Sequence, residues 1–237
     1  PVAARNVRDT LGVGTQALFV RNDGQWDARV RYEAQLHDAA LFLEDDGLTV
    51  ALRAPLRHPA PGTGHRLAMH AYKMRFVGTS ASPNGEQKQP GYSNYFIGDN
   101  TARWRSGVPA FSVARYKDLY PGIDLELYTA SNALKYNFIV NPGADPAQII
   151  LEYDGTDGIS IGSDGSMRIR TTVRDIVELR PYTYQRSADG KEHEVASRWQ
   201  LSRKDKAYSV SVDVTGPYDA QRELVIDPVV QLRSSTY

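Results

Sequence analysis

Alternation of apolar and polar residues with a period of two is the feature that most restricts how this chain can fold. In "KYNFIV", Tyr136, Phe138 and Val140 fall on one face of an extended segment, and "YSVSVDV" and "IDLELY" alternate in the same way. Successive side chains of a strand point to opposite sides, so these segments predict strands with one buried and one wet face. Helical periodicity extends nowhere beyond about one turn. We therefore predict an all-β protein.

The turn signals agree with this prediction. Asp-Gly pairs begin at residues 23, 46, 154, 157, 164 and 189, mostly between the alternating segments. This pair tolerates the positive φ angles of tight hairpins, which connect antiparallel strands. The expected fold is an antiparallel β-sandwich, built either as one unit or as two packed sandwich lobes.

The chain divides into a leader and a strand-rich body. Residues 1–16 are polar and show no strand pattern, whereas residues 17–237 are predicted to form the all-β domain. Within that domain we expect sub-lobes at 17–77 and 92–237, joined by a loop at 78–91 that is rich in Gly, Ser and Pro.

Composition excludes several classes of function. The 28 Lys and Arg residues balance 28 Asp and Glu residues, so no basic surface indicates nucleic acid or anionic lipid. The chain has no cysteine, which removes disulfides, thiol nucleophiles and thiolate metal sites. Its apolar runs are too short for a transmembrane helix. The first residue is Pro1 and not Met, which suggests either a processed secretory precursor or a trimmed chain.

Several strings of the sequence together resemble a known bacterial domain. They are "FVRNDGQWDARVRYEAQ", "HAYKMRFVG", "PGYSNYFIGDN", "WRSGVPAFSVARYKDLYPGIDLELY", "YNFIVNPGADPAQI" and "LVIDPVV", in this order. The chain is similar to an uncharacterised N-terminal β domain of bacterial secreted and surface proteins that carry SBBP (β-propeller) or PKD-type repeats. The resemblance implies export and a β fold, and it implies no established activity. No catalytic residue is therefore transferred to this chain.

Residues 90–100, "PGYSNYFIGDN", contain a cluster of aromatic residues. With nearby Trp104, the side chains of Tyr92, Tyr95 and Phe96 could form a platform for sugar rings, because aromatic faces offer a large contact area at low entropic cost. The favoured interpretation is a turn that feeds a buried strand, with alternate residues of "YFI" entering the core.

Other candidate constellations are weaker. Asp124 and Glu126 lie two apart on one strand face, about 6.6–6.8 Å from each other, which suits a pair of glycosidase carboxylates as well as a solvated face. Calcium binding is a further alternative, because three aspartates lie in successive glycine-rich turns: Asp154, Asp157 and Asp164. The regular calcium-binding loop is missing, however. No zinc spacing, nucleotide loop or nucleophile elbow is present, so we expect neither metal nor cofactor.

The sequence favours a non-catalytic structural or adhesive module, located outside the cell or on its surface. It would act by contact with other protein modules or with copies of itself, without nucleic acid or membrane insertion. Strand addition at a sheet edge is one route to assembly, and the residues expected to take part are Arg5 and Arg8 of the leader and Val229, Val230 and Leu232 of the C-terminal strand. The first alternative is a carbohydrate-binding module that could contact surface glycans, and the second is a glycoside hydrolase.

Overall fold

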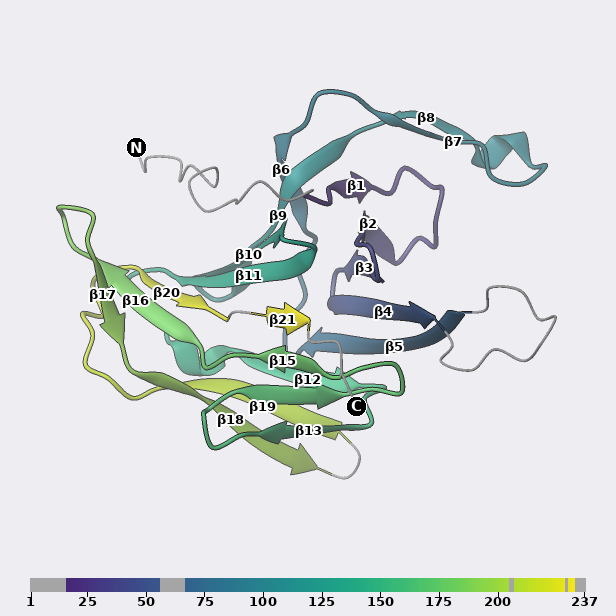
Figure 1. The fold of residues 1–237 in the computed structure, drawn as a ribbon. Coiled ribbons are helices and arrows are strands. Elements are labelled where there is room, and N and C mark those ends of the chain that lie inside the picture. The colour runs from purple at the N-terminus through teal and green to yellow at the C-terminus, as the bar shows by residue number, and fades with distance from the viewer. Residues whose placement is uncertain (1–15, 56–66, 205–206, 229, 233–237) are drawn as a thin grey trace.

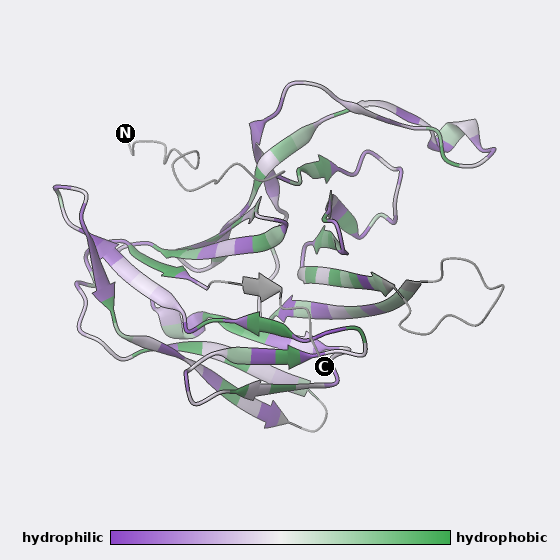
Figure 2. Cartoon of the chain, viewed as in Figure 1, coloured by the Kyte–Doolittle hydropathy of each residue, from purple (hydrophilic) through white to green (hydrophobic). Residues whose placement is uncertain are grey.

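The computed structural model describes residues 16–55, 67–204, 207–228 and 230–232. Within these residues the regular elements are strands, apart from two short 3-10 turns, η2 (Thr101–Arg103) and η3 (Pro146–Gln148). The prediction of an all-β chain is confirmed. Figure 2 shows apolar and polar residues alternating along the strands of the body, as the sequence pattern requires.

One large antiparallel sheet forms most of the molecule. Fourteen of its strands follow one path, in the order β17-β16-β20-β11-β10-β9-β1-β2-β3-β4-β5-β12-β19-β18, and β6 pairs with β9 beside that path. The strands in the first part of the chain are β1 (Phe19–Arg21), β2 (Val30–Gln35), β3 (Ala39–Glu44), β4 (Gly47–Pro55), β5 (Leu67–Phe76), β6 (Asn84–Lys88), β9 (Ala110–Tyr120), β10 (Ile123–Ala130) and β11 (Ala133–Val140). The later ones are β12 (Ile150–Asp154), β16 (Tyr182–Arg186), β17 (Glu192–Val195), β18 (Ser197–Lys204), β19 (Ala207–Val214) and β20 (Leu224–Asp227).

The large sheet branches at β9. Val113 pairs with Glu86 of β6 and with Tyr128 of β10, whereas Phe111 pairs with Lys88 of β6 and with β1. Because β6 runs in one register along a single edge of β9, β10 and β1 must share the opposite edge. Two branches of the sheet therefore diverge from β9 and curve around a common interior (Figure 1).

The two ends of the path meet, and the sheet is nearly closed into a barrel-like shape. The terminal strands β17 and β18 are consecutive in the chain, separated by Ala196 alone. Across this corner the hydroxyl oxygens of Thr183 and Ser197 lie 2.7 Å apart. The expected sandwich is therefore wrong: the branch at β9 and the meeting of the two ends curl one sheet around itself, so two separate sheets do not form its walls.

A smaller sheet packs inside this curve. Its strands are β13 (Gly158–Ile161), β14 (Met167–Arg170), β15 (Ile176–Glu178) and β21 (Val230–Leu232), paired in that order. We call it the inner sheet. Met167, Ile169 and Ile176 belong to the same hydrophobic cluster as Phe138 and Leu125 of the large sheet. One continuous core thus fills the barrel-like shape, and strands from 17–77 and from 92–237 both line it.

Candidate functional site

A two-stranded arm projects from the body of the protein. Its strands β7 (Ser93–Tyr95) and β8 (Arg105–Val108) pair antiparallel, and they continue into β6 and β9 at the base. Figure 1 shows the arm extending away from the barrel-like body above β1. β6 lies within the segment 78–91, where the sequence analysis expected a loop. We call residues 90–108 the aromatic arm.

The loop between β1 and β2 holds the arm at the end of β7 and β8 nearest the tip, where Tyr95 lies opposite Arg105. Arg105 donates from Nε to the carbonyl oxygen of Asp23 and from Nη1 to that of Ala102, at 2.7 Å for the latter. The rings of Trp26 and Tyr95 pack edge to face with centroids 5.2 Å apart. Gly24 has a φ of 108°, and a Cβ atom there would lie 2.6 Å from Nη2 of Arg105. A glycine is therefore needed where this loop meets the arm.

The tip of the arm presents an apolar surface to solvent. Of the seven large hydrophobic side chains exposed within the described residues, four lie on the arm: Tyr92 (70% exposed), Phe96 (60%), Ile97 (54%) and Trp104 (41%). The rings of Phe96 and Trp104 pack edge to face, 5.3 Å between centroids. The indole Nε1 of Trp104 donates to the carbonyl oxygen of Gly98 at 3.1 Å. Because that donor is used inside the tip, the outward surface of Trp104 is apolar.

These positions overturn the interpretation that the stretch feeds a buried strand. Tyr95 is half-buried against Trp26, while Phe96 and Ile97 are exposed and do not enter the core. The reason is topological: β7 and β8 form a separate two-stranded sheet, so no second layer covers them. All four residues proposed for binding, Tyr92, Tyr95, Phe96 and Trp104, lie on this one arm.

The two carboxylates considered for glycoside hydrolysis share one arginine. Arg115 of β9 makes ion pairs with Glu126 and with Asp124, the latter at 3.4 Å, and a third with Glu86 at 3.0 Å. The other oxygen of Asp124 accepts from the backbone N–H of Asp118 at 2.7 Å. These contacts tie β6, β9 and β10 together across the branch of the sheet.

The aspartates considered for calcium have separate roles. Asp154 pairs with Arg75 at 3.3 Å, and Oδ1 of Asp164 accepts from the backbone and hydroxyl of Ser166 within a turn. Across the described ranges, no group of three or more His, Asp or Glu side chains is arranged to hold a metal ion.

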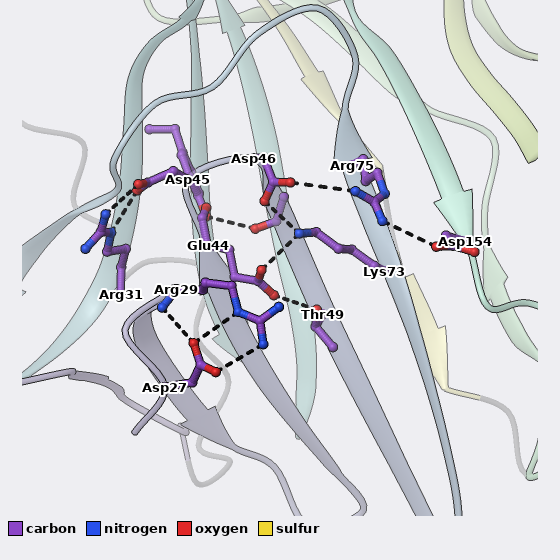
Figure 3. A network of polar contacts seen from close by, with 12 residues as sticks. Asp27, Arg29, Arg31, Glu44, Asp45, Asp46, Thr49, Lys73, Arg75 and Asp154 are labelled. Carbon is purple, nitrogen blue, oxygen red and sulfur yellow. Dashed lines mark hydrogen bonds and ion pairs between the residues drawn. The ribbon is translucent and has the colours of Figure 1, made fainter. Parts of the chain in front are cut away.

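A charged groove lies beside the loop that holds the arm. It has a volume of about 850 Å³ and is lined mainly by acidic and basic side chains, which come from β2, β3 and β5, from the segment before β2 and from the turn between β3 and β4. Figure 3 shows how these charges face one another: Arg31 binds Asp45 through two contacts, and Nζ of Lys73 lies 2.9 Å from Glu44. Lys73 also pairs with Asp46 at 2.6 Å, and the pKa of that carboxyl is lowered by this contact. The network cancels its own charge, which suits a structural role across the strands.

A carboxyl group lies inside the core. Glu178 of β15 is only 4% exposed, and its Oε2 accepts from the hydroxyl of Tyr136 at 2.6 Å. Beside them is a cavity of about 30 Å³, lined by apolar side chains and by Tyr72 and Tyr153. Glu178 was not among the residues predicted from the sequence, although "DIVELR" places an acid on the same strand face as Ile176. That break in the apolar pattern was the available signal.

The residues proposed for assembly divide into two groups. Arg5, Arg8 and Val229 lie outside the described residues. Val230 and Leu232 lie in β21, where they pair with Glu178 and Ile176 of the same chain. One edge of this strand is thus occupied within the molecule.

None of the helices among the described residues is long and apolar enough to cross a membrane.

Comparison with known proteins identifies the family alone. No curated protein and no solved structure is significantly similar to the chain. The model of one family matches residues 19–229, a range that contains the loop between β1 and β2, the aromatic arm, the branch at β9 and Glu178. The chain therefore belongs to the family described as domain of unknown function DUF7948.

Proposed function

We propose that this domain is a non-catalytic contact module, which uses the aromatic arm to bind copies of itself. The carrying observation is the apolar tip, where Phe96, Ile97 and Trp104 are exposed on a ribbon that the body anchors through Arg105 and Trp26. Exposed aromatic clusters of this kind are enriched in protein interfaces, where burial of their area supplies most of the binding energy.

The charge of the chain supports a second copy as the partner. With 28 basic and 28 acidic residues, two copies meet without long-range repulsion. The tip of the arm offers the exposed apolar area of Phe96, Ile97 and Trp104, so it suits an apolar surface of a folded partner. The resemblance to domains of bacterial secreted and surface proteins supports a structural or adhesive role for such contacts at the cell surface.

The test is sedimentation velocity across a wide range of protein concentration. We expect the purified chain to self-associate, and we expect the double substitution Phe96→Ser and Trp104→Ser to abolish association. Met69→Ser is the matched control, because Met69 is 64% exposed on β5, outside the arm. A chain that stays monomeric at every concentration, or an arm variant that associates as well as the control, would contradict the proposal.

Carbohydrate binding is the competing function for the same residues. Trp104 and Phe96 provide rings on which sugars could stack, as in a carbohydrate-binding module. A glycan-binding assay with Trp104→Ala separates the two functions. If the wild-type chain is monomeric and binds a glycan, and Trp104→Ala loses that binding, the domain is a carbohydrate-binding module and not a contact module.

A further inference from the structure

Glu178 occupies an unusual place for a carboxyl group. It lies on β15, in the middle of the inner sheet, and its side chain lines the cavity enclosed by β3, β4, β5, β11 and β12. Apolar side chains supply most of that lining, including Leu41, Val50 and Leu52. A charge in such surroundings loses its hydration and is strongly disfavoured unless a cation compensates it.

The groups facing Glu178 are phenols. They come from three strands of the large sheet: Tyr136 from β11, Tyr72 from β5 and Tyr153 from β12. The nearby guanidinium of Arg174, which precedes β15, pairs instead with Asp38. Among the described residues, no Lys, Arg or His forms an ion pair with Glu178. Burial raises the pKa of Glu178 to about 7, although the hydrogen bond from Tyr136 opposes this rise.

The strand that carries Glu178 also holds the C-terminal strand. β15 pairs with β14 on one side and with β21 on the other, and Glu178 lies opposite Val230 in that register. β21 has β15 as its strand partner in the described structure. Any movement of β15 that lets water reach the carboxyl group therefore acts directly on the attachment of β21.

We propose that Glu178 is a proton-binding site that controls how firmly the inner sheet, and β21 with it, is held inside the curved large sheet. With the proton bound, the neutral carboxyl group remains hydrogen-bonded to Tyr136 in the apolar cavity. When the proton leaves, the carboxylate gains hydration if β15 moves outward, so opening of the inner sheet becomes easier. This coupling is independent of the aromatic arm and of the proposed function.

Amide hydrogen exchange measures the opening directly. After correction for the intrinsic rate at each pH, the opening equilibrium of the β15 and β21 amides should rise roughly tenfold between pH 6 and pH 9, since the buried acid binds its proton more tightly than an exposed one. In Glu178→Gln the rise should vanish, because the amide has no proton to lose in this range. Glu33→Gln is the matched control, since burial also raises the pKa of Glu33, which lies on β2 outside the inner sheet.

Either of two results would overturn the proposal: corrected opening in the wild-type chain that does not change with pH, or a rise that persists in Glu178→Gln. The infrared carbonyl-stretch band of a protonated carboxylic acid gives a second measurement that needs no stable variant. The wild-type chain should show this band at pH 6 and lose it by pH 9. Its absence at pH 6 would show that the carboxyl group is already ionised and that the inner sheet tolerates the charge.

Discussion

The core and the aromatic arm contain the same kind of aromatic pair in opposite surroundings. In the core, Tyr136 and Phe138 pack edge to face with centroids 5.9 Å apart, and both are almost wholly buried. At the tip of the arm, Phe96 and Trp104 pack edge to face at 5.3 Å, and both remain exposed. Ring geometry is thus a poor guide to the contribution of a pair to stability. The surrounding layers decide whether its apolar area is removed from water on folding or is left for a partner.

Truncation of one phenylalanine in each region should show the largest difference between the two aromatic pairs in their contribution to the free energy of unfolding. Phe138→Ala leaves a large cavity in the core and should lower the free energy of unfolding by about 3–5 kcal/mol. Phe96→Ala removes a ring from the exposed tip and should cost less than about 1 kcal/mol. Chemical denaturation monitored by tyrosine and tryptophan fluorescence checks both. Equal losses for the two variants would show that the arm is part of the cooperative core.

A charge-free substitution of Glu178 should change how stability depends on pH. Its folded pKa of about 7 exceeds the ordinary value of 4.5, so the folded state binds the proton more tightly than the unfolded state. The contribution of Glu178 to the free energy of unfolding is therefore fully present below about pH 4.5 and is lost as the pH rises through about 7, a total loss of about 3 kcal/mol. Compared with the wild-type chain, the free energy of unfolding of Glu178→Gln should be higher by about that amount at pH 8 and little changed at pH 4.

Denaturant midpoints measured across this pH range provide the check. Asp99→Asn is the matched control on the arm, where the carboxyl group is exposed at the tip. It should leave the pH profile unchanged. A profile for Glu178→Gln that runs parallel to wild type would refute the assignment of this pH dependence to the buried carboxyl group.

Removal of the Arg105 side chain, which ties the arm to the loop between β1 and β2, should separate the order of the arm from global stability. Arg105→Ala loses the hydrogen bonds to the carbonyl oxygens of Asp23, Ala102 and Trp104 and should cost about 1–3 kcal/mol. Because the arm has no layer above it, this cost should appear mainly as local opening. Limited proteolysis within residues 96–104 should accelerate several-fold, while Arg103→Ala, at an exposed position of the same tip, should not change it. Uniform acceleration throughout the body would argue against a locally anchored arm.

The smallest expected effect concerns the charged groove. Arg31 and Asp45 make a paired contact with both side chains more than a third exposed, so solvent screens their attraction. Arg31→Gln should destabilise the chain by about 0.5 kcal/mol or less, and the difference should shrink at 1 M salt. Thermal melts at low and high salt measure it. A loss that high salt leaves undiminished would indicate a packing role for the aliphatic part of Arg31.

Local pattern was sufficient to predict the elements but not the position of each aromatic cluster. The alternation in "KYNFIV" and "IDLELY" predicted β11 and β10, and their inward residues are buried as expected. The same reasoning placed alternate residues of "YFI" (95–97) in a core, because an extended aromatic segment looks alike whether or not another layer covers it. In "DIVELR", the acidic residue at an inward position was visible, yet its partners Tyr136 and Tyr72 lie far away in the chain.

Three properties follow from the amino-acid sequence alone: antiparallel strands with an apolar face, Asp-Gly pairs at several of the turns, and a net charge of zero. Those properties depend on neighbouring residues alone. Three further properties are visible only in the folded chain: one sheet branches at β9 and curls into a barrel-like shape, this sheet encloses Glu178, and the aromatic arm projects from it. These outcomes depend on which distant strands pair and in which register, because such pairing determines which side of each alternating strand is covered.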